Sequence, residues 1–143
     1  MKMFVLDTNV ISELRQGKPS QSPGVRAWAA AQPADRLFLS AITILELEKG
    51  IQALKRCTPP HGSALRSWLT GVRAAFSGRI LPFTEQTAAL CAALHVPNAR
   101  AERDAMIAAT AIEHGFTVVT RNVPDFINTG VQLLNPWSHA AAS

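Results

Sequence analysis

The chain alternates short runs of apolar residues with longer segments in which apolar residues recur every three or four positions. The short runs, which predict strands, lie at residues 3–6, 37–39, 79–83, 116–120 and 131–134. The first and the fourth show no polar alternation, which is typical of strands covered on both faces of a sheet. The longer segments predict helices at residues 8–15, 23–32, 63–76, 85–95 and 101–114, and a long helix that begins after residue 40 or 43 and runs to about residue 56.

Proline, glycine and capping residues mark the ends of several predicted helices. Ser40 or Thr43 could cap the long third helix, Pro23 lies in the first turn of the second, and Gly115 is placed to end the last. The stretch 58–62, Thr-Pro-Pro-His-Gly, is expected to break the chain between two helices. Strands alternating with helices predict a three-layer α/β sandwich, with helices on both faces of a mostly parallel central sheet of four or five strands.

Length and composition fit one globular domain, expected over residues 1–143 with an ordered core at about 3–137. Hydrophobic residues make up 48% of the chain and charged residues 17%, which excludes a disordered acidic chain. No apolar run reaches the roughly 18 residues that cross a bilayer, and the start does not resemble a signal peptide. Cys57 and Cys91 form no CxxC pair. We therefore expect a cytoplasmic protein with reduced cysteines and no membrane partner.

The charge balance suggests a polyanionic partner. Fourteen Lys and Arg face ten Asp and Glu, for a net charge of +4. If four of those ten acids share one site, as argued below, the rest of the chain is strongly basic. A basic shell around an acidic centre suits a protein that attracts a polyanion and binds metal in its middle, although many small basic proteins bind nothing anionic.

Two acids follow predicted buried strands. Asp7 comes directly after residues 3–6, and Asp125 lies a few residues beyond residues 116–120. In open α/β sheets, binding sites lie beyond the carboxyl ends of the strands, where a carboxylate is partly desolvated and needs a cation or donors. Taken singly, Asp7 could equally be a helix N-cap, and Asp125 a turn residue.

Two further acids lie on predicted helices whose surroundings are apolar or small. Glu46 is flanked by leucines in Leu45-Glu46-Leu47, and Asp104 opens the run Asp-Ala-Met-Ile-Ala-Ala-Thr-Ala. The small residues after Asp104 would let that helix approach the sheet closely. Singly, Glu46 could be an exposed helix acid, and Asp104 a favourable charge near a helix N-terminus.

Together, the four acids favour a metal site. Like charges gathered at low dielectric repel one another, and a cation relieves that repulsion. Oxygen ligands alone select Mg²⁺ or Mn²⁺ rather than zinc. The four histidines show no HxxxH spacing, and no cysteine pair joins them, which argues against structural zinc.

Four blocks in order resemble one known family. They are Phe4-Val5-Leu6-Asp7-Thr8-Asn9; Ser40-Ala41-Ile42-Thr43 with Glu46-Leu47 and Gly50; Asp104 with Ile107-Ala108-Ala109-Thr110-Ala111; and Thr120-Arg121-Asn122 with Asp125-Phe126. These blocks, with the closing Leu-Asn-Pro-Trp, resemble the PIN-domain ribonucleases, in particular the VapC-type toxins of type II toxin–antitoxin pairs. Any one block alone is weak evidence for the family, but four blocks in the same order over about residues 3–137 are a specific signal.

The resemblance implies a PIN-like fold with a four-acid pocket that binds Mg²⁺ or Mn²⁺ and cleaves RNA. By position, Asp7, Glu46 and Asp104 match the three central metal acids and Asp125 the fourth, where Asn122 could hold part of the role. Polar groups that orient these carboxylates and waters are expected at Asn9, Ser40, Thr43, Thr120 and Asn122. The family further implies a homodimer and a small antitoxin that blocks the pocket.

Three arginines are candidate phosphate contacts: Arg121 beside the site, and Arg66 and Arg73 two turns apart on one helix. Each could also be ordinary solvated surface charge.

Among competing functions, a phosphatase of the haloacid dehalogenase type needs a second Asp two residues after the first, where this chain has Asn9. A response-regulator receiver expects an acidic pair before the first helix and a late Lys, which are missing here. An RNA- or partner-binding domain that does not cut remains open.

Overall fold

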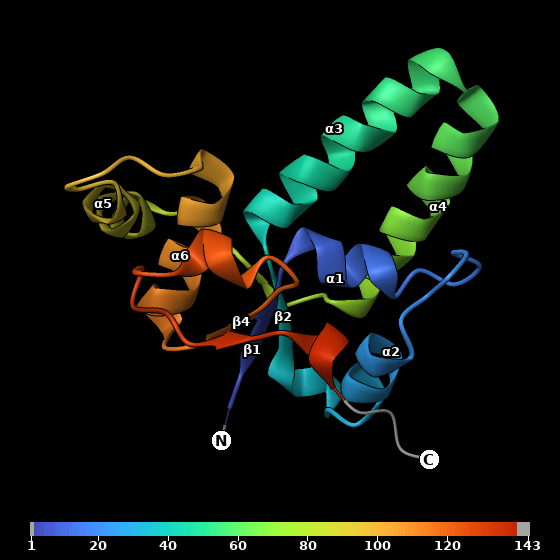
Figure 1. Cartoon of the computed structure of the whole chain (residues 1–143). Helices are drawn as coiled ribbons and strands as arrows, with labels where there is room; N and C mark the ends of the chain where they lie inside the picture. The colour runs from blue at the N-terminus through green and yellow to red at the C-terminus, as the bar shows by residue number, and fades with distance from the viewer. Residues whose placement is uncertain (1, 140–143) are drawn as a thin grey trace.

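The computed structural model describes residues 2–139, so residue 1 and residues 140–143 of the expected domain span lie outside the described part. Its five strands form one sheet in the order β3-β2-β1-β4-β5, and the neighbouring strands pair in parallel (Figure 1). The strands are β1 Phe4–Leu6, β2 Leu37–Ser40, β3 Ile80–Leu81, β4 Thr117–Val119 and β5 Leu133–Leu134. The predicted parallel sheet is confirmed.

Helices cover both faces of this sheet, as predicted. They are α1 Thr8–Glu13, α2 Pro23–Ala30, α3 Ala41–Cys57, α4 Pro59–Ala75, α5 Glu85–Leu94 and α6 Glu102–His114. Short 3-10 turns lie at η1 Ala34–Arg36, η2 Val123–Phe126 and η3 Pro136–Ser138. In Figure 1, α5 and α6 lie to one side of the sheet, α1 and α2 to the other, and α3 and α4 project together as a long hairpin.

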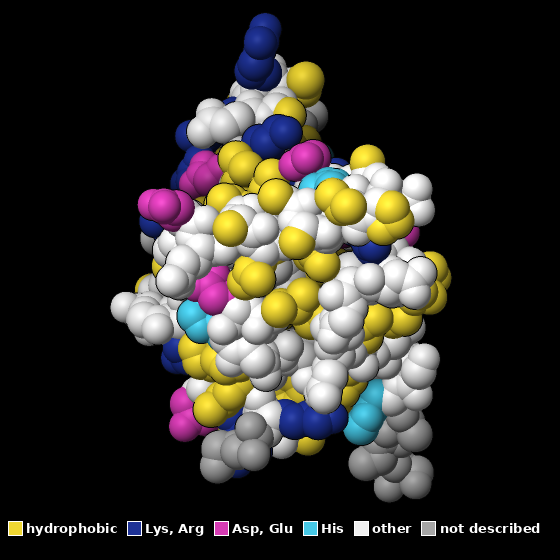
Figure 2. All heavy atoms as spheres, turned by 90° about the vertical axis from the view of Figure 1, so that its left-hand side faces the viewer, with side chains coloured by type: hydrophobic (Ala, Val, Ile, Leu, Met, Phe, Trp, Pro, Cys, Tyr) yellow, Lys and Arg dark blue, Asp and Glu magenta, His cyan; other side chains and the backbone are white. Residues whose placement is uncertain are grey.

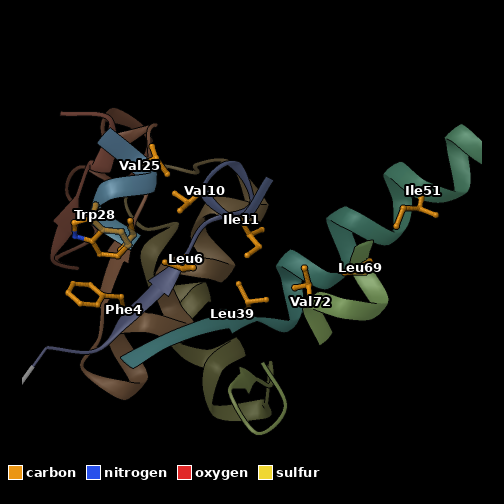
Figure 3. Packing of buried hydrophobic residues seen from close by; sticks show 11 residues of the cluster. Phe4, Leu6, Val10, Ile11, Val25, Trp28, Leu39, Ile51, Leu69 and Val72 are labelled. Atoms are coloured by element: carbon orange, nitrogen blue, oxygen red, sulfur yellow. The ribbon is translucent and has the colours of Figure 1, made fainter. Parts of the chain in front are cut away.

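The alternation of side chains along β1 divides the core into two layers. Phe4 and Leu6 point to the face covered by α1 and α2, where they join Val10, Trp28 and other buried residues (Figure 3). Val5, between them, points to the opposite face and packs against small and aliphatic residues of α6. Because both faces of the sheet are buried, the sequences of its central strands are continuously apolar and do not alternate between apolar and polar residues.

The α3–α4 hairpin differs from the prediction at its bend. The stretch 58–62 was expected to break the chain, yet only Thr58 separates the two helices, because α4 already begins at Pro59. Proline is favoured at the first helical positions, where the missing N–H has no intrahelical acceptor. Gly62 then lets the two helices meet closely, since a Cβ there would lie 2.8 Å from the Lys55 backbone nitrogen.

The carboxyl ends of β1, β2 and β4 meet at one edge of the sheet and position polar residues there. Asp7 follows β1 and caps α1, while Ser40 ends β2 and caps α3 by accepting a hydrogen bond from the Ile42 backbone at 2.9 Å. Ser40, rather than Thr43, is therefore the cap of the long helix. Thr120 follows β4. Within residues 2–139, none of the helices is both long and apolar enough to traverse a bilayer.

Basic side chains gather at one end of the molecule. Figure 2 shows Lys and Arg at the top of the view, at the height where the α3–α4 hairpin projects in Figure 1. The α3 end of this hairpin carries Lys55 and Arg56 in its last turn. The expected basic shell is thus concentrated partly on a projecting arm, away from the sheet edge where Asp7 lies.

Candidate functional site

A pocket of about 550 Å³ opens at the carboxyl edge of the sheet. All four acids singled out from the sequence line it, and each comes from a different part of the fold: Asp7 after β1, Glu46 on α3, Asp104 on α6 and Asp125 on η2. The structure therefore brings together four carboxylates that are far apart in the sequence. Their role as metal ligands stays a prediction.

Asp7 is buried and firmly held. Its Oδ1 accepts the Thr8 backbone N–H at 2.8 Å, and its Oδ2 accepts the Thr120 hydroxyl at 2.8 Å and the Asn9 side-chain amide at 3.4 Å. Burial raises the pKa of Asp7 above its usual value, and the hydrogen bonds from Thr120 and Thr8 oppose that rise. Asp7 is thus both the expected helix cap and a site residue, so the two alternatives are compatible.

Glu46 reaches the pocket from the first half of α3. Its Oε1 lies 2.9 Å from the Thr8 hydroxyl, and its Oε2 forms an ion pair of 2.7 Å with the Arg103 guanidinium of α6. The Thr8 hydroxyl also lies 3.3 Å from the Thr43 hydroxyl. Both oxygens of the Glu46 carboxylate are therefore occupied by groups of the chain itself.

Asp104 is partly buried and lies near the other three acids. Partial burial, together with the negative charges of Asp7, Asp125 and Glu46, raises the pKa of Asp104 to about 6, and the charge of Arg103 opposes this rise. Within the described residues, no hydrogen bond to the Asp104 or Asp125 carboxylate is present. Both residues line the pocket, which therefore holds a concentrated and incompletely neutralised group of negative charges.

The four carboxylates line one pocket, but they are not grouped closely enough around one position to bind a single metal ion together. Within residues 2–139, no three Asp, Glu, His or Cys side chains stand close enough to share a metal ion as they are placed. Two of the four acids are turned toward other partners: Glu46 toward Arg103 and Thr8, and Asp7 partly toward Thr120. Glu46 could serve a shared cation with its Oε2 only after that oxygen had left Arg103.

The residues expected to orient the acids fall into two groups. Asn9 and Asn122 line the pocket, and the Thr120 hydroxyl binds both Asp7 and the Asn122 backbone N–H. Thr43 touches the site only through Thr8, and Ser40 caps α3 instead of contacting an acid. Thr8 itself was not singled out, although it directly follows Asp7.

The three arginines proposed as phosphate contacts do not line the pocket. Arg66 is held by the Glu48 carboxylate through two contacts of 2.5 and 2.7 Å, and Arg121 stacks on the Trp137 ring at 5.3 Å. Arg73 lies on α4, in the projecting hairpin. The basic side chain that does line the pocket is Arg103, which sequence reasoning missed. Its position directly before Asp104 was the available signal.

An apolar groove adjoins the acidic pocket. It runs between α1, α3 and α4 and is lined mainly by Leu47, Ile51, Leu65 and Trp68, with Arg15 and Lys18 near its rim. Glu46 lines the groove as well as the pocket. A partner seated in the groove would therefore lie within reach of the acids.

Comparisons with known proteins agree with this geometry. The PIN domain model matches residues 4–129. The VapC ribonuclease Y4jK of Sinorhizobium fredii is 40% identical and aligns with 96% of this chain and 100% of its own. The crystal structure of FitAcB from Neisseria gonorrhoeae is 37% identical over 95% of this chain and 99% of the other, with a TM-score of 0.86. A toxin–antitoxin complex from Klebsiella pneumoniae is 25% identical, with a TM-score of 0.66 over 92% and 96%.

Proposed function

This chain belongs to the PIN-domain family, with the VapC-type toxins among its relatives, and on that premise we propose that it is a Mg²⁺- or Mn²⁺-dependent endoribonuclease, the toxin of a toxin–antitoxin pair. The observation that carries the proposal is the meeting of four carboxylates, from four separate elements, in one pocket of a chain with net charge +4. An acidic centre in a basic protein suits a metal-assisted reaction on a polyanion.

The pocket's donor groups fit a hard divalent cation. Asp7, Glu46 and Asp104, with Asp125 beside them, offer only carboxylate oxygens, the ligand type that Mg²⁺ and Mn²⁺ prefer. The raised pKa of Asp104 reflects negative charges that a cation would relieve. When bound, such a cation supplies Lewis-acid chemistry, in which it activates water and offsets charge on the phosphoryl oxygens.

The chain's own side chains keep these ligands in place. Thr120 and the Thr8 backbone hold the two oxygens of Asp7, so that its carboxylate keeps one orientation beside the pocket. Asn9 contacts Asp7 and also accepts the Arg121 backbone N–H at 3.3 Å, which ties the loop after β4 to α1. Groups that orient a metal ligand contribute to affinity and activity although they do not touch the metal.

The direct test uses amide variants of the acids. Asp7→Asn, Glu46→Gln and Asp104→Asn should each lower Mg²⁺-dependent RNA cleavage by about 100-fold or more, because the amide keeps the shape and removes the charge that the cation needs. Asp35→Asn is the matched control, since Asp35 is exposed in η1 outside the pocket. Melting curves in EDTA establish that each variant is folded.

Cleavage that persists in all three amide variants would reject the assignment of the site. Wild-type protein that binds RNA and Mg²⁺ but never cuts would favour instead a PIN domain that binds without cleaving.

We further propose that the antitoxin binds the groove beside the pocket. A short amphipathic helix would place its apolar face against Leu47, Ile51 and Trp68, in the usual helix-in-groove mode. Because Glu46 lies at the junction of groove and pocket, a basic side chain of the partner could enter among the acids and block the cation. The expected homodimer stays a prediction, which light scattering of the free chain tests.

A further inference from the structure

Arg103 places a positive charge inside the acidic pocket. It lies in the first turn of α6, directly before Asp104, and its Nη1 is 2.7 Å from Oε2 of Glu46 on α3. This ion pair closes the pocket on the side where α3 and α6 approach each other. The same charge counteracts the rise in the pKa of both Asp7 and Asp104. Arg103 thus acts electrostatically on three of the four acids.

The two partners of this ion pair differ in their exposure. The Glu46 side chain is 15% exposed, whereas the Arg103 side chain is 62% exposed. Ion pairs with one exposed partner are held weakly, because water replaces the lost contact at little cost. The Thr8 hydroxyl contacts the other oxygen of the Glu46 carboxylate, so Glu46 would keep one partner if the exposed guanidinium of Arg103 moved away.

The other basic side chains close to this region are engaged elsewhere. Arg66 is bound by Glu48, and Arg121 stacks on Trp137. Arg103 is the basic residue among those lining the pocket, and its partner is a residue that we assign to metal binding. A divalent cation in the pocket would therefore compete with the Arg103 guanidinium for the Glu46 carboxylate.

We propose that Arg103 is an exchangeable counter-cation, which holds Glu46 in the metal-free protein and is released to contact a phosphate of the RNA when a divalent cation occupies the pocket. The proposal rests on the function proposed above. The guanidinium is suited to the second role, because its planar fork of donors matches a phosphate and its charge does not titrate. Its place at the pocket mouth puts it where a phosphodiester would approach.

The exchange predicts opposite effects on metal and on RNA when the charge is removed. Arg103→Gln should tighten Mn²⁺ binding about threefold to tenfold, because the competitor for Glu46 is gone. The same variant should weaken RNA binding about threefold to tenfold in the presence of Mn²⁺, because a phosphate contact is lost. Without metal its effect on RNA binding should be small, since Arg103 is then occupied by Glu46.

The test measures Mn²⁺ binding to the full chain by calorimetry, with no RNA present, and then the binding of a labelled single-stranded RNA by rapid-mixing anisotropy with Mn²⁺ or EDTA. Arg36→Gln is the matched control, because it removes the same charge from η1, outside both the pocket and the α3–α4 hairpin. Arg103→Lys retains a charge and should restore near wild-type Mn²⁺ affinity. In a Glu46→Gln background, Arg103→Gln should no longer change Mn²⁺ affinity, which shows that it acts through Glu46.

Weaker or unchanged Mn²⁺ binding by Arg103→Gln, while wild type binds Mn²⁺, would overturn the exchange and leave the nuclease assignment intact. An equal loss of RNA binding with Mn²⁺ and with EDTA would also overturn it. Wild-type protein that binds no Mn²⁺ would overturn both the exchange and the metal-dependent function. Melting curves of the variants verify that each is folded.

Discussion

At the scale of single residues, one side chain often has two roles that sequence reasoning treated as alternatives. Asp7 caps α1 through the Thr8 backbone N–H and also lines the acidic pocket. Asp104 lies in the first turn of α6, as a helix-stabilising acid would, and faces three other carboxylates. A helix that begins beside a sheet edge brings its capping acids to the site, so local stability and chemistry depend on the same atoms.

The raised pKa of Asp104 makes a prediction about stability. A carboxyl whose pKa is about 6 in the folded protein, against an ordinary 3.8, binds its proton more tightly when folded. Folding free energy is therefore lost as pH rises through this window, and the penalty is complete above it. In EDTA at about pH 7.5, Asp104→Asn should raise stability by about 1 kcal/mol, allowing for solvent screening, or about 3 °C in Tm.

Thermal melts of wild type and Asp104→Asn at about pH 4.5 and 7.5 check this sign, since the advantage of the variant should shrink at the lower pH. Added Mg²⁺ should stabilise wild type more than the variant, because only wild type retains all the carboxylates that we propose as metal ligands. A variant that melts well below wild type at both pH values would show that Asp104 has a structural role.

At the scale of elements, the α3–α4 hairpin positions both parts of the proposed function. The beginning of α3 brings Glu46 to the pocket, and the next turns of α3, together with Leu65 and Trp68 of α4, form the groove. The close approach of the two helices depends on Gly62 near the bend, where a Cβ would lie 2.7–2.9 Å from Lys55 atoms. The hairpin is therefore a packed unit despite its projection from the body.

Two glycine substitutions on α4 should have opposite effects on stability. Gly62→Ala should lower the free energy of unfolding by about 1–3 kcal/mol, because Lys55 backbone atoms must shift to admit the methyl group. Gly71→Ala should raise it by about 0.5–1 kcal/mol, because its Cβ meets no atom within 4 Å and alanine favours the helix. Urea titrations of both variants measure the difference. Equal effects would mean that α3 and α4 are not packed this closely at the bend.

At the scale of the whole molecule, an acidic pocket and an apolar groove share Glu46, so that catalysis and its inhibition are expected to use one continuous surface. The α3 side of the hairpin continues past the groove to Lys55 and Arg56 in its last turn, which form a basic arm. Charge on the arm would attract RNA over a distance, while the acids act only at contact. This division explains how a site of four carboxylates could work on a polyanion.

The shared surface predicts how the partner protein inhibits. Purified complex with the product of an adjacent small gene should not cut RNA even with Mg²⁺ in excess, whereas the free chain should. Gly50 lines the groove, and a Cβ added there would meet no atom within 4 Å, so Gly50→Leu would occupy the partner's space. We expect this variant to need about tenfold more partner for half-inhibition. Gly71→Leu, outside the groove, is the control.

A tight complex that still cut RNA at the full rate would contradict inhibition through the pocket and leave the nuclease assignment standing. Equal effects of the two leucine variants would contradict the groove as the docking site.

The sequence by itself determined the features that depend on neighbouring residues. Continuous apolar runs predicted the buried strands, spacing predicted the helices, and the place of Asp7 after a strand indicated the sheet edge where the site lies. The apolar and small neighbours of Glu46 and Asp104 singled out these two helix acids, and the resemblance to a family then joined all four acids in one expected pocket. Each of these signals lies within a few residues, because strand burial and helix caps are local properties.

The tertiary structure alone decided which side chains meet. Arg103 and Glu46 are 57 positions apart, so their ion pair depends on how α6 packs beside α3. Glu48 selects Arg66 across the hairpin for the same reason, which removes that arginine from the expected phosphate contacts. The hairpin bend was also misjudged, because Pro59 was taken as a break although it begins a helix. Contacts between residues that are distant in the sequence depend on how the helices pack, and a local sequence pattern does not predict them.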